Sequence, residues 1–226
     1  MKVSNRLVII TALFVTCLLT ANIIGVKIWA SGSVSLPAAV IIFPFSYIFG
    51  DILTEVYGYR QARKVIWLGF LCNFIFVLFA WLGKILPPAS FWAGQEAYNT
   101  ILGYAPRLLV ASFLGYLVGE FANSFVLAKM KIMTNGRLLW SRTIGSTIVG
   151  ESLDSIIFIT VAFVGTSYFV PIMILYHLLT KIAIEVLFTP ATYLIVNYLK
   201  KKESIDTYDF NTNFNPLPFL KRKVTD

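Results

Sequence analysis

Acidic and amide side chains recur at helical spacing inside stretches of the chain that are otherwise apolar. Asp51 and Glu55 are four residues apart, and Glu151 and Asp154 are three apart. Residues at these spacings lie on one face of an α-helix, so each pair would form a polar stripe along its helix. Two further segments carry the same pattern: Glu120 with Asn123, and His177 with Lys181 and Glu185.

These stripes offer a chemistry that suits cations, protons and ligands with N–H donors. An ionised carboxylate accepts two hydrogen bonds side by side, and the acids of the stripes outnumber their bases. Two structural alternatives stay open. Lys181 and Glu185 would neutralise each other as a pair within one helix. Glu55 would lie at the membrane edge and pair with Arg60 or Arg63.

The cost of burying these acids in a membrane indicates that they have a function. An Asp at the centre of a membrane-spanning helix costs about 2.5 to 3.5 kcal/mol, whereas a Leu or Ile returns only about 0.3 to 0.6 kcal/mol. One acid therefore cancels the contribution of several apolar residues. A helix that carries Glu151 and Asp154 must turn its polar face to protein or water.

We therefore predict that the polar stripes converge on a binding pocket at the middle of the membrane. The predicted binding residues are Asn22, Asp51, Glu55, Glu120, Asn123, Glu151, Asp154, Lys181 and Glu185. Asn73 would add a hydrogen bond from the third span. Aromatic residues near the start of the second span would stack on a flat ring, although such residues more often serve packing; they are Phe43, Phe45 and Tyr47.

The elements that position these residues follow from the composition. The chain has 226 residues, of which 58% are hydrophobic and 13% charged, whereas soluble domains are near half apolar and a quarter charged. Stretches of about 20 apolar residues cross the hydrocarbon core as helices. We predict an all-α, polytopic bundle of six transmembrane helices at 7–29, 36–57, 65–86, 107–129, 143–165 and 172–198.

The first apolar run also begins like a signal peptide, and WASGS near residue 30 resembles a weak cleavage site. The run is roughly 23 residues long, which favours a membrane span over a signal sequence. We find no linker that would bound a second domain. We predict a transmembrane domain at 1–200 and a cytoplasmic tail of little regular structure at 201–226.

The basic residues indicate the orientation of the spans. The formal net charge is +8, and 15 of the 19 Lys and Arg residues fall before the first span or after the second, fourth and sixth. The positive-inside rule then places both termini in the cytoplasm. Since the charge gathers at span ends and not on one soluble face, it predicts contact with the lipid bilayer and no contact with nucleic acid.

Several function classes are excluded or disfavoured. A single histidine excludes a zinc site built from several histidines, and the two cysteines lie in apolar runs with no metal-binding spacing. Without a P-loop, this chain alone would not use ATP, and no channel filter is present. We predict a small-molecule carrier that is not an enzyme and needs no cofactor or metal.

Five segments of the sequence resemble a known family. They are FPFSYIFGDILTEVYGYRQARK, APRLLVASFLGYLVGEFANSFVLAKMK, LWSRTIGSTIVGESLDSIIFI, KIAIEVLFTPATYLIV and ESIDTYDFNTNFNPL. Together, with the block D-x-x-x-E-x-Y-G, they are similar to the queuosine precursor transporters of the vitamin uptake transporter class. The resemblance implies a bacterial inner-membrane importer of 7-cyano-7-deazaguanine or 7-aminomethyl-7-deazaguanine, precursors of the tRNA nucleoside queuosine.

The resemblance also implies roles for the predicted site. Glu151 or Asp154 would accept hydrogen bonds from the purine edge, and Asp51 or Glu55 would lie near the amine. Lys181 would meet the carbonyl or tune the pKa of the acids. The alternative is a substrate-binding membrane subunit of an ATP-driven vitamin or nucleobase uptake complex. The sequence leaves open the energy coupling and whether the chain forms a homodimer.

Overall fold

The computed structural model describes residues 4–31, 34–103, 106–165, 169 and 171–217. Within these residues, six long helices are apolar enough to cross a membrane, which agrees with the predicted all-α fold of six spans. A short 3-10 helix, Ala38–Ile41, precedes the second long helix and belongs to its span. The long helices are α1 (Asn5–Ile24), α2 (Phe43–Tyr57), α3 (Tyr59–Ile85), α5 (Pro106–Met133), α6 (Leu139–Phe163) and α7 (Ile172–Glu203).

Two elements between the long helices were not predicted. The first helix ends at Ile24, and the chain continues into an antiparallel hairpin, β1 (Ile28–Ser31) and β2 (Val34–Pro37). The predicted span 7–29 is therefore too long at its end. Hydropathy does not separate a helix from an apolar strand, which explains the error. The loop after α3 contains a short helix, α4 (Gln95–Leu102).

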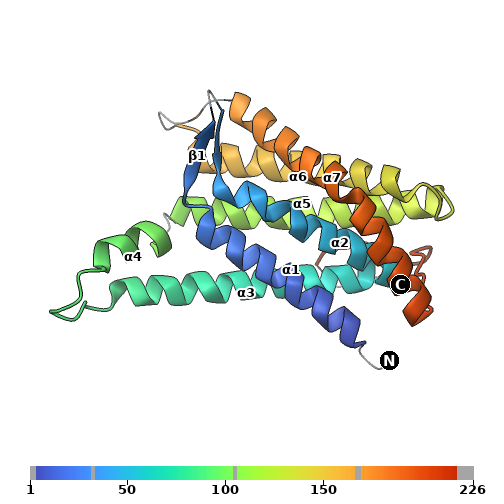
Figure 1. Cartoon of the computed structure of the whole chain (residues 1–226), viewed down its shortest axis with the longest axis horizontal. Coiled ribbons are helices and arrows are strands. Elements are labelled where there is room, and N and C mark those ends of the chain that lie inside the picture. The colour runs from blue at the N-terminus through green and yellow to red at the C-terminus, as the bar shows by residue number, and fades with distance from the viewer. Residues whose placement is uncertain (1–3, 32–33, 104–105, 166–168, 170, 218–226) are drawn as a thin grey trace, which may run out of the picture.

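The described ends of the chain lie at the same end of the bundle (Figure 1). Arg6 at the start of α1 forms an ion pair of 3.7 Å with Glu203 at the end of α7. We call this end, with the α2–α3 and α5–α6 connections, the tail end. The opposite end carries β1, β2 and α4, and we call it the hairpin end. That the tail end faces the cytoplasm remains a prediction.

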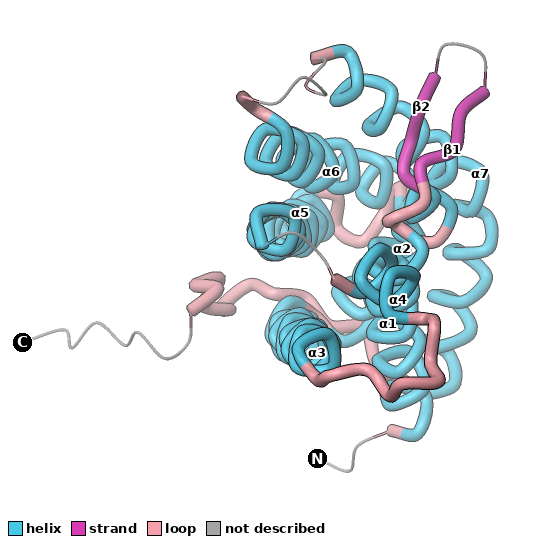
Figure 2. The backbone as a smooth tube through the Cα atoms, turned by 90° about the vertical axis from the view of Figure 1, so that its left-hand side faces the viewer, coloured by secondary structure: helices cyan, strands magenta, loops and turns pink. Residues whose placement is uncertain are grey.

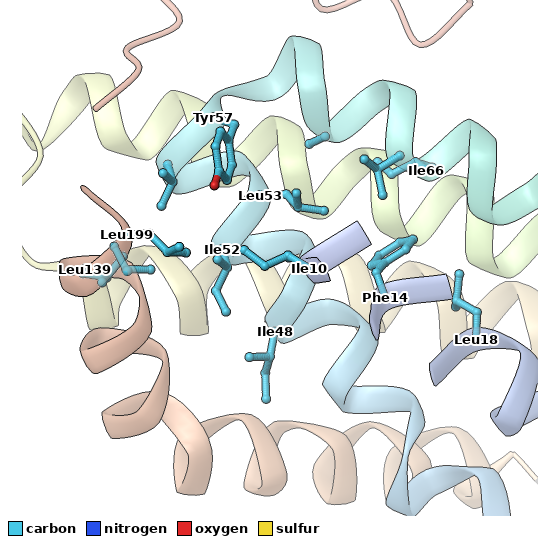
Figure 3. Close-up of a cluster of buried hydrophobic side chains, with 14 of the residues drawn as sticks. Ile10, Phe14, Leu18, Ile48, Ile52, Leu53, Tyr57, Ile66, Leu139 and Leu199 are labelled. Carbon is cyan, nitrogen blue, oxygen red and sulfur yellow. The ribbon is translucent and has the colours of Figure 1, made fainter. Parts of the chain in front are cut away.

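Helix α2 is the central element of the bundle. Seen from the hairpin end, α3, α5 and α6 form one row, and α2 lies between this row and α7 (Figure 2). It packs on α1, α3, α5, α6 and α7. An apolar cluster fixes its contact with α1, where Ile10, Phe14 and Leu18 meet Ile48 and Ile52 of α2 (Figure 3).

The outer surface of the bundle is apolar. Large hydrophobic side chains on α1, α3 and α7 are exposed, among them Phe79, Leu187 and Leu194, each more than 60% exposed. Soluble monomers rarely expose contiguous apolar surface on this scale, whereas lipid tails solvate it. The apolar outside and the polar residues inside are therefore the arrangement expected for a membrane bundle.

Helix α7 continues to Glu203, and the tail after it has no helix or strand between residues 204 and 217, yet it is held by hydrogen bonds to the bundle. Asp209 is buried and accepts a hydrogen bond of 2.9 Å from the backbone N–H of Tyr59, the first residue of α3. Gly58, which joins α2 to α3, has a φ of 80°. A Cβ at this position would lie 2.6 Å from the methyl group of Thr207, so the tail requires glycine here.

Candidate functional site

A cavity of about 130 Å³ lies near the hairpin end of the bundle. For comparison, an engineered cavity of about 150 Å³ holds one benzene ring. The lining comes from α1, the 3-10 helix, α2, α5, α6 and α7. Its polar and aromatic members are Asn22, Phe43, Ser112, Asp154, Phe158, His177 and Lys181.

The two charged residues of the cavity wall, Asp154 and Lys181, belong to a buried triad that is completed by Glu151, across α6 and α7. The Lys181 ammonium donates to Glu151 Oε2 at 2.5 Å and to Asp154 Oδ2 at 2.6 Å. The same ammonium lies 4.3 Å from the centre of the Phe43 ring, which adds a cation–π contact. The alternative of a Lys181–Glu185 pair is wrong, because Lys181 turns to α6 and both Glu185 oxygens lack hydrogen-bond partners in the described chain.

The rest of the wall contains residues outside the predicted binding set, although His177 belongs to a polar stripe that was predicted to reach the pocket. His177 Nδ1 lies 3.0 Å from the Ser155 hydroxyl, and its ring stacks near Phe158 at a centroid distance of 6.3 Å. His177 lies four residues before Lys181, and Phe158 lies four residues after Asp154. Helical spacing could therefore have placed both on the same face as a predicted site residue. Nothing in the sequence pointed to Ser112.

Asn22 lies on the cavity as predicted. Its Nδ2 donates to Asn73 Oδ1 of α3 at 2.5 Å, so Asn73 bonds to Asn22 and does not itself line the cavity. The Ser112 hydroxyl lies 3.4 Å from Asn22 Oδ1. This network ties α1, α3 and α5 together beside the cavity.

Only one of the three predicted stacking residues lines the cavity. Phe43 does, but Phe45 packs its ring on Phe188 at 4.7 Å and is absent from the lining. Tyr47 is fully buried in the core and also does not reach the cavity. Residues two apart on a helix point in different directions, which separates Phe43 from Phe45.

A second group of predicted residues lies in the core and outside the cavity lining. Asp51 accepts a hydrogen bond of 2.7 Å from Asn123 Nδ2, and its other oxygen has no partner among the described residues. Glu120 and Glu185 have no hydrogen-bond partner there on either carboxyl oxygen. All four side chains are at most 1% exposed, so they are buried away from bulk solvent.

Glycines let the helices that carry these acids approach closely. GDILTE in α2, GEFANS in α5 and GESLDS in α6 each begin with a glycine followed by an acid. A Cβ on Gly119 would lie 2.9 Å from the carbonyl oxygen of Gly150, and one on Gly50 would lie 2.9 Å from Glu120 Oε2. The three similar segments therefore meet in the core at points where no side chain fits.

Glu55 lies apart from the cavity, in an ion-pair cluster at the tail end. Its carboxylate accepts from Arg142 Nη2 at 2.8 Å and from Lys200 Nζ at 2.6 Å. Lys131 Nζ donates to the Glu55 backbone carbonyl at 2.5 Å and to Asp206 of the tail at 2.5 Å. Lys200 also pairs with Asp206 at 2.9 Å. We call these five residues the Glu55 cluster.

Glu55 is therefore ion-paired, as the structural alternative expected, but Arg60 and Arg63 are not its partners. Both follow the turn at Gly58, and Arg63 instead donates to the backbone carbonyls of Asn213 and Asn215 in the tail. From the sequence, Arg142 and Lys200 are expected only to set the orientation in the membrane. Their buried pairing with Glu55 shows that some of the tail-end charge also has a structural role.

Comparison with known proteins identifies the family. Residues 37–195 match the family described as "Putative vitamin uptake transporter". The chain belongs to this family. It is a multi-pass membrane protein of a transporter family, and not an enzyme.

Two relatives of this chain carry the name "Probable queuosine precursor transporter". The protein from Bacillus subtilis (strain 168) is 38% identical over 117 residues, which cover 51% of each chain. The protein from Haemophilus influenzae (strain ATCC 51907 / DSM 11121 / KW20 / Rd) is 22% identical over 166 residues, 71% of this chain and 68% of that protein. The chain thus spans about half the length of the first relative. No solved structure matches the chain.

The family match covers all the buried acids of the membrane-spanning helices. Residues 37–195 include Phe43, Glu55, Glu151, Asp154 and Lys181, and exclude α1 and the tail. Chemically, the cavity offers a carboxylate acceptor, an ammonium donor and two aromatic faces. Such a wall can bind a small, flat, nitrogen-rich molecule.

Proposed function

We propose that the chain imports queuosine precursors, and that 7-cyano-7-deazaguanine or 7-aminomethyl-7-deazaguanine binds in the cavity beside Asp154 and Lys181. The observation that carries this proposal is the charged pair in the cavity wall, an acceptor from α6 within 2.6 Å of a donor from α7. The names of the two relatives point to the same class of substrate.

The substrate edge is complementary to this pair. A 7-deazaguanine presents N1–H and an exocyclic amine on one edge, with a carbonyl beside them. Asp154 would accept from the two N–H groups, and Lys181 would donate to the carbonyl. Phe43 and Phe158 would offer their ring faces to the flat heterocycle.

The roles of the remaining acids change from those that the resemblance implied. Glu151 does not line the cavity, and its Oε2 accepts from Lys181, so we assign it the positioning of that ammonium. Asp51 and Glu55 also lie outside the lining. We therefore place neither of them against the substrate amine in this conformation.

Import requires that the cavity open to each side in turn. The cavity lies at the hairpin end, which the basic residues predict to be external, and the Glu55 cluster ties α2, α5, α6, α7 and the tail together at the other end. We propose that this cluster is the inner gate. Passage to the cytoplasm would then require Arg142 and Lys200 to leave Glu55.

Binding is tested with the purified chain and the two deazaguanine bases, read as thermal stabilisation. Asp154→Asn removes a charged acceptor, and hydrogen bonds to charged groups are worth about 1.5 to 3 kcal/mol. We expect a loss of affinity of roughly 10- to 100-fold. Glu96→Gln, an exposed carboxylate on α4, is the matched control and should bind normally.

Transport is tested with the chain alone in proteoliposomes. Uptake of labelled 7-cyano-7-deazaguanine by this preparation would support a self-sufficient carrier. Tight binding without any exchange of labelled base would favour the alternative, a substrate-binding subunit of an ATP-driven complex. Absence of both binding and exchange would refute the proposed substrate.

A further inference from the structure

The core contains more buried acid than the cavity uses. We call Asp51, Glu120, Glu151, Asp154 and Glu185 the central acids. Among the described residues, Lys181 is the only cation that forms an ion pair with any of them, and it pairs with Glu151 and Asp154. Glu120 and Glu185 are 0% and 1% exposed, and no described group donates a hydrogen bond to either.

This arrangement does not allow all five acids to be ionised together. Five carboxylates and one ammonium would leave a net charge of −4 inside the bundle. The effective cost of a buried, uncompensated ion is several kcal/mol, and nearby like charges add to it. Buried acids without partners avoid that cost by carrying a proton.

A metal ion is a poor alternative as the neutralising partner. Hard cations need several oxygen ligands that converge at about 2.0 to 2.6 Å. Across the part of the chain that the structure describes, no group of three or more His, Cys, Asp or Glu side chains is arranged to hold a metal ion. The proton is the cation that needs only one carboxylate.

The acids without partners are electrostatically linked to the substrate wall. Glu120 on α5 interacts electrostatically with Glu151 and Asp154 of α6 and with Lys181 and Glu185 of α7. On the α2 side, the Gly50 backbone lies against the Glu120 carboxylate.

The surroundings of Glu185 and Asp51 connect the same set. Glu185 interacts electrostatically with Glu151, and Asp51 interacts in the same way with Glu185, Glu120 and Glu55. Tyr116 is also near Glu120, and its hydroxyl already donates to the Ile66 carbonyl of α3. A ligand that draws Lys181 or Asp154 out of the triad would therefore change the charge that every other central acid experiences.

We propose that Glu120 and Glu185 are proton-binding sites and that this chain couples substrate import to proton entry. The inference rests on the proposed function. In this conformation Glu120 and Glu185 carry protons that they took up from the hairpin-end side, and substrate then binds Asp154 and Lys181 while these two carboxyls stay protonated. An O–H bond forms there and breaks again when the proton is released at the tail end, with the substrate. No electron transfer is involved.

The test uses the full chain in proteoliposomes and two assays of labelled 7-cyano-7-deazaguanine, a neutral probe. Exchange, in which labelled base outside replaces unlabelled base inside, needs binding and alternation but no gradient. Net uptake is then measured with the outside buffer more acidic by one pH unit. We expect the gradient to raise initial net uptake several-fold and to drive accumulation of up to roughly tenfold over the outside concentration.

Variants locate the effect. Glu120→Gln and Glu185→Gln keep the shape of the side chain and cannot give up a proton. Each should lower the ratio of gradient-driven uptake to exchange about tenfold or more, whereas Glu96→Gln on α4 should leave this ratio unchanged. Because the ratio is taken within one preparation, a reduced yield of folded protein does not change it. As a second assay, a pH-sensitive dye trapped inside the vesicles should report substrate-dependent acidification only for chains that keep both acids.

The outcomes separate the two proposals. No exchange by the parent chain would refute the proposed function. Normal exchange with no effect of the gradient and no acidification would leave the proposed function standing and overturn proton coupling. Gradient-driven uptake that survives in both Gln variants would overturn the assignment to Glu120 and Glu185.

Discussion

Replacing Glu55 by Gln tests the physical role of the Glu55 cluster. The substitution keeps the size of the side chain but removes the charge that Arg142 and Lys200 approach at 2.8 and 2.6 Å. Glu55 and Arg142 are fully buried, and Asp206 would remain as the one acid facing three cations. Removing one partner of a buried ion pair costs about 3 to 5 kcal/mol, because the other charge stays buried without compensation.

This loss is measurable as thermal stability of the purified chain in detergent. For chains of about this length, 1 kcal/mol corresponds to roughly 2 to 4 °C in Tm, so Glu55→Gln should lower Tm by roughly 6 to 20 °C. Glu96→Gln, on exposed α4, is the control and should change stability by about 0.5 kcal/mol or less. The double variant Glu55→Gln/Arg142→Met should recover part of the loss, since the buried guanidinium is removed as well.

A Tm for Glu55→Gln within about 2 °C of the parent would refute the reasoning, because the cations would then be hydrated in the folded chain and not held by Glu55. If Glu55→Gln lowers Tm and Glu55→Gln/Arg142→Met does not recover any of that loss, then the effects of the two substitutions are independent. In that case the Glu55–Arg142 ion pair does not hold the tail end closed. Exchange of labelled base by the double variant then shows whether a weaker gate still alternates.

Two further predictions concern the tail and the cavity. Burial raises the pKa of Asp206, but hydrogen bonds from its two lysine partners outweigh burial and hold the pKa below its ordinary value. Docking of the tail should therefore be constant from pH 7 to about 5 and weaken as the pH falls below about 4. The measurement is the rate of protease cleavage within 204–217. In the variant Asp206→Asn this rate should be the same above about pH 5 as below about pH 4. Phe43→Ala should weaken binding of deazaguanine bases about tenfold, whereas Phe45→Ala, which only loses its packing on Phe188, should lower Tm and leave affinity unchanged; equal effects of both on affinity would contradict the placement of the cavity.

The sequence predicts the elements of this fold better than their contacts. Six helices follow from apolar length, whereas the hydrogen bond between Asn22 and Asn73, which joins the first span to the third, was not predicted. The spacing rule states which residues share a face, but not which faces meet. Arg142 pairs with Glu55 across 87 positions, and no local pattern connects them.

The same rule explains which parts of the site were misplaced. Hydropathy treats β1 as more helix, so the hairpin that follows α1 near the cavity was missed. Applied strictly, the spacing would have separated Phe43 from Phe45. The rotation of α7 in the assembled bundle decides which of its residues find partners. It turns Lys181 to α6 and leaves Glu185 without a hydrogen-bond partner among the described residues.

Helix α2 connects the cavity to the proposed gate, the Glu55 cluster. Phe43, Tyr47, Asp51 and Glu55 follow one another at steps of four residues and therefore share a face. At 1.5 Å per residue this stripe is about 18 Å long, more than half of a hydrocarbon core of about 30 Å. Its first residue lines the cavity, its third is a central acid and its last is held in the Glu55 cluster.

A movement of α2 relative to α6 and α7 would act on all three levels at once. It would separate Glu55 from Arg142 and Lys200, change the distance of Asp51 from Glu185, and move Phe43 away from Lys181. Since α2 is one continuous helix packed on five other long helices, we expect these changes to occur together. Release of the substrate, discharge of the central acids and opening of the gate are therefore expected to be one transition, and a variant that weakens the gate should also weaken the dependence of uptake on the pH gradient.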